Sequence, residues 1–184
     1  RCTESLPSFW EHGLVHSSRP GCSQKAGDLR ILVLGGYGVF GGRLAELLSD
    51  IPELELVICG RTFARAQKFC EEYQGPTKVR PLALARSDIE VGLRQQRPDL
   101  VVDASGPFQD YAVESYNVVT ACIANKIHYL DFADAAGFVF GVSQFDAEAR
   151  RAGVFVLSGV SSFPVLTAAV LRHMTKCMDI VSVE

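Results

Sequence analysis

Residues 31–48 read ILVLGGYGVFGGRLAELL, and five of the eight residues from Gly35 to Gly42 are glycine. Glycine loses more conformational entropy on folding than any other residue, which costs about 0.5–1 kcal/mol relative to alanine inside a helix or strand. The glycines lie between an apolar run typical of a buried strand and an amphipathic run typical of a helix. A junction that tolerates this cost is expected to bring its backbone close to another group.

The glycine spacing is G-x-G-x-x-G, which binds the pyrophosphate of a dinucleotide when it follows a strand and opens a helix. Gly36 is expected to allow the tight turn, Gly38 to let the backbone approach the pyrophosphate, and Gly41 to let helix and strand pack closely. Free N–H groups and the helix dipole then face the phosphates. A glycine-rich turn without a ligand is the alternative. The predicted loop consists of Gly36, Tyr37, Gly38, Val39, Phe40 and Gly41.

From residue 29 onward, short apolar runs alternate with segments of helical period. Six strands separated by helices require long crossovers and therefore pair in parallel. We expect an α/β fold: a doubly wound, mostly parallel six-stranded Rossmann sheet with helices on both faces and its ligand site at the carboxyl ends of the strands. The predicted strands are residues 29–34, 54–60, 78–85, 99–105, 128–133 and 154–159, and the predicted helices 41–49, 62–73, 87–96, 111–125, 145–151 and one from residue 164.

Three local signals refine this prediction. Pro81 lacks an N–H and favours an outer position for the strand at 78–85. Thr62 can cap the helix that it precedes through its hydroxyl. Ser87 and Glu90 have the spacing of a capping box at the start of the next helix.

The chain divides into three parts. Residues 1–28 are rich in Ser, Pro, Gly and Cys without hydrophobic periodicity, and we expect a disordered tail. Residues 29–163 form the predicted NAD(P)-binding domain, and 164–184 a linking helix and a strand at 179–184 that would be the first of a truncated second domain. Residues 152–171 carry no charge, but Gly159 and Pro164 interrupt them, so a strand, turn and helix start are favoured over a membrane span.

Charge and cysteine content exclude several classes. The net charge is −3 and no run of Lys or Arg occurs, so the sequence predicts no nucleic-acid partner. The six cysteines form no C-x-x-C pair, and no metal site is expected. Cys59, Cys70 and Cys122 are interpreted as buried thiols in a reducing compartment, which favours the cytoplasm.

The end of the second strand predicts which cofactor is bound. An NAD site would carry Asp or Glu about 20 residues beyond the loop, to accept a hydrogen bond from the ribose 2′-OH. Here Gly60 is followed by Arg61 and Thr62, and no acidic residue occurs until Glu71. A guanidinium and a hydroxyl suit a 2′-phosphate, so NADP(H) is favoured, with NAD still possible.

Two further strand ends are aimed at the cofactor by this fold. The run Ala104-Ser105-Gly106-Pro107-Phe108 ends the fourth strand with small residues that can pass beneath the nicotinamide ribose, with a plain turn as the alternative. The run His128-Tyr129-Leu130-Asp131 is expected to bring polar groups to the same edge; a structural role is favoured over a catalytic one for His128. Asp131 and Asp134 could orient a substrate or cap the next segment, and both interpretations stay open.

Several catalytic patterns are absent from the sequence. It contains no Tyr-x-x-x-Lys pair, which disfavours an epimerase-type enzyme, and no G-x-S-x-G, P-loop or H-E-x-x-H motif. Catalytic residues are therefore not assigned. A non-catalytic dinucleotide-binding or redox-sensing module remains the alternative to an oxidoreductase.

Several landmarks in order resemble the saccharopine dehydrogenase-like family in its N-terminal NAD(P)-binding domain, over Leu29–His173. They are VLGGYGVFGGRLAELL, CGRT, VVDASGPFQ, ACIANKIHYLDFAD, AEARRAGVFVLSG and a proline, Pro164, after the sixth strand.

This resemblance implies an NADP(H)-dependent oxidoreductase that positions nicotinamide for hydride transfer. It assigns the three glycines of the motif to the pyrophosphate, Arg61 to the adenosine phosphate, and residues 105–107 to the loop beside the nicotinamide. In the family, a second α/β domain supplies most of the substrate site and the dimer surface. A small-molecule substrate and a homodimer are therefore expected of the full-length protein, without membrane or nucleic-acid partners.

Overall fold

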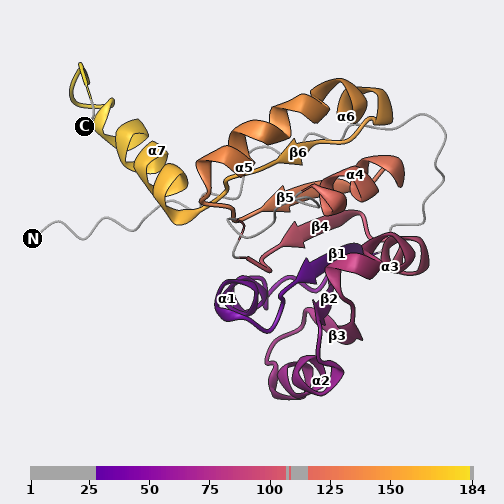
Figure 1. Cartoon of the computed structure of the whole chain (residues 1–184). Helices are drawn as coiled ribbons and strands as arrows, with labels where there is room; N and C mark the ends of the chain where they lie inside the picture. The colour runs from indigo at the N-terminus through magenta and orange to yellow at the C-terminus, as the bar shows by residue number, and fades with distance from the viewer. Residues whose placement is uncertain (1–27, 107, 109–115, 183–184) are drawn as a thin grey trace, which may run out of the picture.

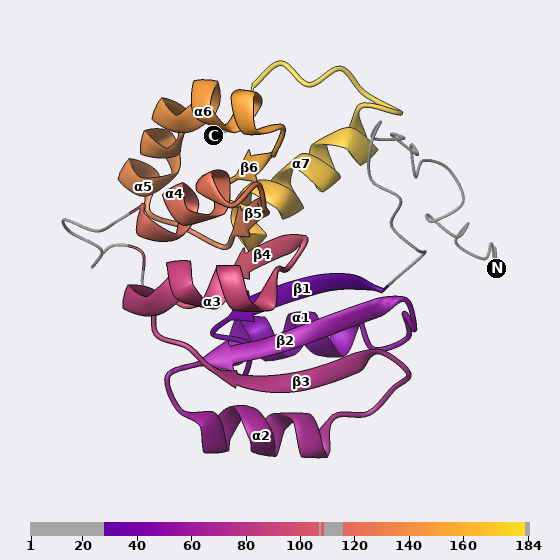
Figure 2. The same cartoon turned by 90° about the vertical axis from the view of Figure 1, so that its right-hand side faces the viewer.

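The computed structural model describes residues 28–106, 108 and 116–182. Among them, six strands form one sheet in the order β3-β2-β1-β4-β5-β6, and all five pairings are parallel. Figure 2 shows β3, β2, β1 and β4 side by side in this order. The predicted Rossmann fold is confirmed. The strands are β1 (Leu29–Leu34), β2 (Leu54–Gly60), β3 (Lys78–Ala83), β4 (Leu100–Asp103), β5 (His128–Asp131) and β6 (Val156–Leu157).

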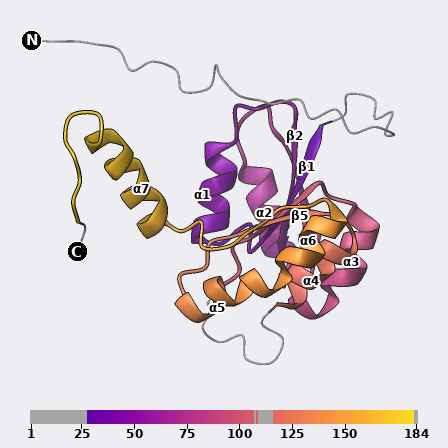
Figure 3. The same cartoon turned by 90° about the horizontal axis from the view of Figure 1, so that it is seen from above.

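Helices cover both faces of the sheet. Figures 1 and 3 show α1 on the opposite side from α3, α4 and α6, and α7 standing apart from the sheet. The helices are α1 (Val39–Leu47), α2 (Phe63–Glu72), α3 (Ile89–Gln96), α4 (Asn117–Ala124), α5 (Ala136–Gly141), α6 (Asp146–Ala152) and α7 (Ser162–Met174), with 3₁₀ turns at Arg86–Asp88 and Val142–Phe145.

The central strand β1 explains why both layers form. Its residues alternate between two hydrophobic clusters: Leu32 and Leu34 pack under α3 and α4, whereas Ile31 and Val33 pack under α1 and α2. All four side chains are at least 94% buried, which is why the run is continuously apolar rather than alternating. The same residues therefore specify a sheet sandwiched between two helical layers.

Several element boundaries differ from the sequence-based predictions. Helix α1 begins at Val39 rather than at Gly41, and β6 is limited to two residues of the predicted 154–159. Residues 179–182 form no strand, and 183–184 lie outside the described residues, as do residues 111–115 of the predicted helix at 111–125. A strand at 179–182 would need a free sheet edge beside it, and the turn after α7 does not bring it to one.

The edge position predicted from Pro81 is confirmed, because β3 is an outer strand. The two capping predictions are wrong. Thr62 precedes α2 without a side-chain cap hydrogen bond. A 3₁₀ turn over Arg86–Asp88 comes before α3, so Ser87 lies within that turn and no capping box forms.

The three predicted buried thiols are all free of disulfides, but only two of them are buried. Cys59 and Cys122 are buried as expected, whereas Cys70 is half-buried. Burial raises the pKa of Cys59 to about 12 and that of Cys70 to about 11, so these thiols stay protonated at neutral pH. Within the described residues, no helix has both the length and the apolar character needed to cross a membrane.

One ion-pair network joins the neighbouring strands β1, β2 and β3. The Glu55 carboxylate on β2 accepts hydrogen bonds from Arg30 Nε on β1 at 2.7 Å and from Arg80 Nε on β3 at 2.6 Å. Partial burial by itself would raise the pKa of Glu55, but the hydrogen bonds and charges of Arg80 and Arg30 outweigh it and leave the pKa below the ordinary 4.5. The network therefore stabilises the fold while Glu55 is ionised.

We expect Glu55→Gln to lower the free energy of unfolding by about 2 kcal/mol at pH 7, because two charge-assisted hydrogen bonds are lost. A depressed folded-state pKa adds stability above the unfolded pKa, and this stability disappears as pH falls through the folded pKa. The deficit of the variant should therefore shrink below pH 4.5, the ordinary value. Urea unfolding at pH 7 and pH 3 measures it, with the exposed pair variant Glu90→Gln as the control. An equal deficit at both pH values would contradict the prediction.

Candidate functional site

The glycine turn lies between β1 and α1 at the carboxyl ends of the strands. Gly35 has φ +71°, in the left-handed region that favours glycine, so the tight turn predicted for Gly36 falls one residue earlier. The Gly36 N–H donates to the Cys59 carbonyl of β2 at 2.9 Å, and the Gly38 N–H closes the turn on the Gly35 carbonyl at 2.8 Å. Gly36 therefore continues the β1–β2 pairing, and Gly35 makes the turn.

The motif glycines are also sterically required. A Cβ on Gly36 would lie 2.9 Å from the Val33 carbonyl oxygen. A Cβ on Gly41 would lie 2.4 Å from the Gly35 carbonyl oxygen and 2.8 Å from the Gly36 Cα, and backbone atoms cannot give way as a flexible side chain can. The close packing predicted for Gly41 is thus present, between the first turn of α1 and the glycine turn.

The start of α1 is open to a ligand. Gly38 is the N-cap residue, no side chain caps the helix, and its first turn contains no acidic residue. Val39 and Phe40 are exposed, and the N–H groups of a helix's first turn have no partner within the helix. The helix dipole adds partial positive charge there. Backbone donors without covering side chains fit a diphosphate.

Tyr37 crosses from this turn to the end of β2. Its hydroxyl accepts a hydrogen bond from the Thr62 N–H at 3.1 Å. A Cβ on Gly60 would lie 2.3 Å from the Tyr37 ring, so the ring covers that glycine. Arg61 and Thr62 follow directly and are exposed. The predicted phosphate loop and the predicted adenosine-phosphate position are therefore adjacent and joined by a side chain.

A buried ion pair supports the loop after β4. Asp103 is fully buried and forms an ion pair with Arg86, which comes from the 3₁₀ turn after β3. Asp103 Oδ1 accepts from both the N–H and the hydroxyl of Ser105, at 3.0 and 2.5 Å. Arg86 also donates to Ser105 Oγ at 3.2 Å and pairs with Asn117 on α4. Ser105 is thus held in place, whereas Pro107 lies outside the described residues.

Sequence reasoning missed Arg86, which lies 17 residues before its partner. Nothing in a run such as ALARSD distinguishes an arginine that turns inward from a solvated one. The apolar run ending in Asp103 offered a clue, because a carboxylate at the end of a buried strand requires a cation or several donors.

Strand β5 does not bring all its polar groups to the cofactor edge. His128 opens β5 and so lies at the opposite edge of the sheet, which corrects the predicted placement. Its ring stacks on Phe155 with centroids 4.3 Å apart, and its Nδ1 accepts from the Phe155 N–H at 3.1 Å. These contacts match the structural role favoured for His128. Tyr129 is fully buried, and burial together with Asp103 and Asp131 raises its phenol pKa well above 10.

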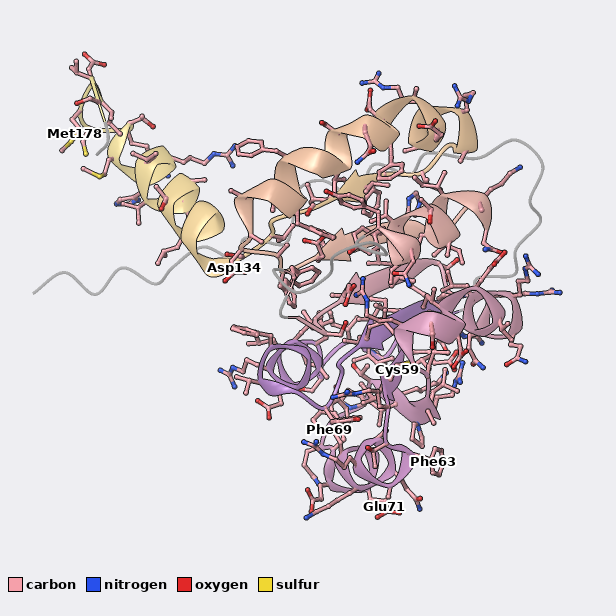
Figure 4. All side chains as sticks on the ribbon, viewed as in Figure 1. Cys59, Phe63, Phe69, Glu71, Asp134 and Met178 are labelled. Carbon is pink, nitrogen blue, oxygen red and sulfur yellow. The ribbon has the colours of Figure 1, made fainter. Side chains whose placement is uncertain are left out.

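Asp131 is buried at the carboxyl end of β5, where it organises two turns. Its Oδ1 accepts from the Ala133 N–H at 2.9 Å, the Ser158 hydroxyl at 3.0 Å and the Gly159 N–H at 2.9 Å. Two roles were considered for Asp131, orienting a substrate and capping the segment that follows. These contacts match the capping role. Asp134 is exposed and lies at the base of α7 (Figure 4).

A cavity of about 550 Å³ opens beside these turns. It extends from one side of α1 to the loops after β4, β5 and β6, and most of its lining is apolar. Within the described residues, no cluster of His, Cys, Asp or Glu could hold a metal ion. The lining residues are Phe40, Arg43, Leu44, Leu47, Ala104, Gly106, Phe108, Phe132, Asp134, Val160 and Ser161.

Comparison with protein families matches residues 31–157 to the saccharopine dehydrogenase NADP binding domain. The chain belongs to this family. The match includes all of β2 to β6 and most of β1, together with the glycine turn, the end of β2 and the loops after β4 and β5. Residues 158–161, which follow β6, lie beyond its end. The resemblance seen in the sequence is confirmed, and this member of the saccharopine dehydrogenase NADP binding domain family is an NAD(P)-binding domain.

Solved structures show the same fold at low sequence identity. A 3-oxoacyl-[acyl-carrier protein] reductase with bound NAD from Brucella melitensis has 16% identity and a TM-score of 0.52, over 72% of this chain and 70% of that one. Pen from Bacillus thuringiensis has 14% identity and a TM-score of 0.53, over 73% of this chain and 50% of the Pen chain. The enzyme WbmG of Bordetella bronchiseptica, in complex with NAD and UDP, has 16% identity and a TM-score of 0.46, over 71% and 52%. This chain thus spans about half the length of WbmG. No curated protein matches the sequence significantly.

Proposed function

We propose that this domain positions the nicotinamide of NADP(H) for hydride transfer in an oxidoreductase. The observation that carries the proposal is an uncapped α1 N-terminus behind a glycine turn, followed at the end of β2 by Arg61 instead of an acidic residue. Because the chain spans only about half the length of Pen, the activity and the substrate of the whole protein are part of this proposal.

Each part of the site would bind a different part of the cofactor. Backbone N–H groups of the first turn of α1, together with the helix dipole, bind the pyrophosphate. Arg61 and Thr62 bind the 2′-phosphate, and the loop after β4 lies beside the nicotinamide ribose. The proposed cofactor-binding residues are Gly36, Tyr37, Gly38, Val39, Phe40, Gly41, Arg61, Thr62, Ser105, Gly106 and Pro107.

The cofactor, when bound, supplies the hydride chemistry, and the protein supplies orientation and surroundings. Asp103 holds the Ser105 hydroxyl at 2.5 Å, so that group is already oriented before any ligand arrives. Phe40, Phe108 and Phe132 give the adjoining cavity an apolar wall.

The proposal also covers the compartment, the class of substrate and the oligomeric state. We place the full-length protein in the cytoplasm, acting on a small molecule and forming a homodimer through a second domain. The unpaired, protonated Cys59 and Cys122 support a reducing compartment. The apolar cavity supports a small-molecule substrate.

Titration of the purified chain with NADPH and NADH, followed by nucleotide fluorescence, tests cofactor binding. We expect NADPH to bind with a sub-millimolar dissociation constant and more tightly than NADH. Lack of binding by either nucleotide would contradict the proposal. Oxidation of NADPH by the full-length gene product with imine or enoyl compounds then separates an oxidoreductase from a non-catalytic redox-sensing module.

A further inference from the structure

We propose that Arg65 is a second guanidinium of the 2′-phosphate site and that Tyr37 holds it there. The inference rests on the proposed function and adds to it a residue that sets the preference for NADP over NAD. It comes from the packing of three residues at the junction of β2 and α2, namely Tyr37, Gly60 and Arg65.

The Tyr37 side chain is held at two points. Its ring covers Gly60, where a Cβ would lie within 2.3–2.4 Å of three ring atoms, counting the hydroxyl oxygen. Its hydroxyl accepts from the Thr62 N–H at 3.1 Å. Position 60 must therefore be glycine for the ring to lie there, and the ring in turn forms a flat surface beside Arg61.

Arg65 lies on this surface. Its guanidinium carbon is 4.8 Å from the centroid of the Tyr37 ring, within the range of a cation–π contact. Such a contact restricts the guanidinium without neutralising its charge, because the ring contributes no carboxylate. Arg65 is four residues after Arg61, so both cations flank the start of α2.

Among the described residues, no carboxylate lies within 4.0 Å of the guanidinium nitrogens of Arg61 or Arg65. Seven other arginines of the described residues do have a carboxylate within this distance. The first acidic residue after β2 is Glu71, whose carboxylate accepts from Gln67 at 2.8 Å. Figure 4 shows Glu71 on the side of α2 that faces away from the sheet.

Two uncompensated guanidinium groups suit a phosphate monoester, which carries close to two negative charges and offers several acceptor oxygens. A ribose 2′-hydroxyl has neither the charge nor the oxygens. Arg65 should therefore contribute to the binding of NADPH and not to that of NADH.

The test measures the dissociation constants of NADPH, NADH, 2′,5′-ADP and 5′-AMP for Arg65→Gln. We expect NADPH and 2′,5′-ADP to bind about tenfold more weakly, as for the loss of one charge-assisted hydrogen bond. NADH and 5′-AMP should change by less than about twofold. Lys68→Gln is the matched control, because it removes one positive charge from an exposed position of the same helix, where Lys68 pairs with Glu72 at 3.7 Å. All four constants should then stay within about twofold, since the charge of Lys68 is already offset by its pairing with Glu72.

The part played by Tyr37 is tested by a double-mutant cycle. Tyr37→Leu should reduce the NADPH-to-NADH affinity ratio about as much as Arg65→Gln, and the double variant should reduce it no further. Additive effects would overturn the role given to Tyr37.

The outcomes separate this inference from the proposed function. If the unmodified chain prefers NADPH and Arg65→Gln leaves the NADPH-to-NADH ratio within twofold, the inference is wrong and the proposed function stands. If the unmodified chain binds neither nucleotide, both are wrong. Equal thermal unfolding midpoints for Arg65→Gln and Lys68→Gln show that any difference between them arises from binding.

Discussion

Replacing Arg61 with aspartate is expected to reverse the nucleotide preference of the chain, from NADPH to NADH. Arg61 follows the last residue of β2, the place from which Rossmann domains contact the adenosine ribose. An aspartate there would repel a 2′-phosphate and accept a hydrogen bond from a 2′-hydroxyl. We expect NADPH to bind about 100-fold more weakly and NADH about as well or better, because a charge-assisted bond is replaced by a repulsion.

Fluorescence titration of both nucleotides at low and high salt measures this reversal. The control is Arg172→Asp, which makes the same change of charge at an exposed position of α7. It should leave the NADPH-to-NADH ratio as it is in the unmodified chain. If Arg61→Asp still prefers NADPH, the phosphate is bound elsewhere and the assignment of the β2 end is wrong.

Replacing Gly41 with alanine is expected to abolish measurable NADPH binding. The new Cβ would lie 2.4 Å from the Gly35 carbonyl oxygen and 2.8 Å from the Gly36 Cα, so either α1 or the glycine turn must move. Overpacking of this kind costs about 1–3 kcal/mol, and the displaced backbone is the part that holds the pyrophosphate. We expect a loss of about 2 kcal/mol in the free energy of unfolding together with the loss of binding.

Gly137→Ala is the matched control for this variant. Gly137 lies on α5, and a Cβ there would meet no atom within 4 Å. Alanine has the higher helix propensity, so stability should stay the same or rise by up to about 1 kcal/mol. Urea unfolding and NADPH titration of both variants provide the comparison. Normal NADPH binding by Gly41→Ala would show that this turn does not hold the phosphates.

Much of the fold is encoded in short stretches of the chain. The continuous apolar run at 31–34, between helical segments, predicts a strand buried on both faces, and Ile31 and Val33 do pack on one face while Leu32 and Leu34 pack on the other. Pro81 by its missing N–H predicted an edge strand, and β3 lies at the edge. The glycine spacing likewise predicted the turn between β1 and α1, and the absence of an acidic residue directly after β2 is visible in the sequence alone. Each of these signals depends on a residue's own backbone or on neighbours within a few positions.

Tertiary structure decided the contacts that carry the site. Arg86 pairs with Asp103 across 17 positions, Tyr37 covers Gly60 across the glycine turn, and the turn itself is made by Gly35. His128 was expected at the cofactor edge but lies at the other one, because strand pairing determines where β5 begins. Such contacts depend on strand register and on the direction each side chain takes after the sheet has formed. The local sequence pattern predicts neither the register nor the side-chain direction. A run such as ALARSD is equally compatible with an arginine in solvent and with one bound to a buried carboxylate.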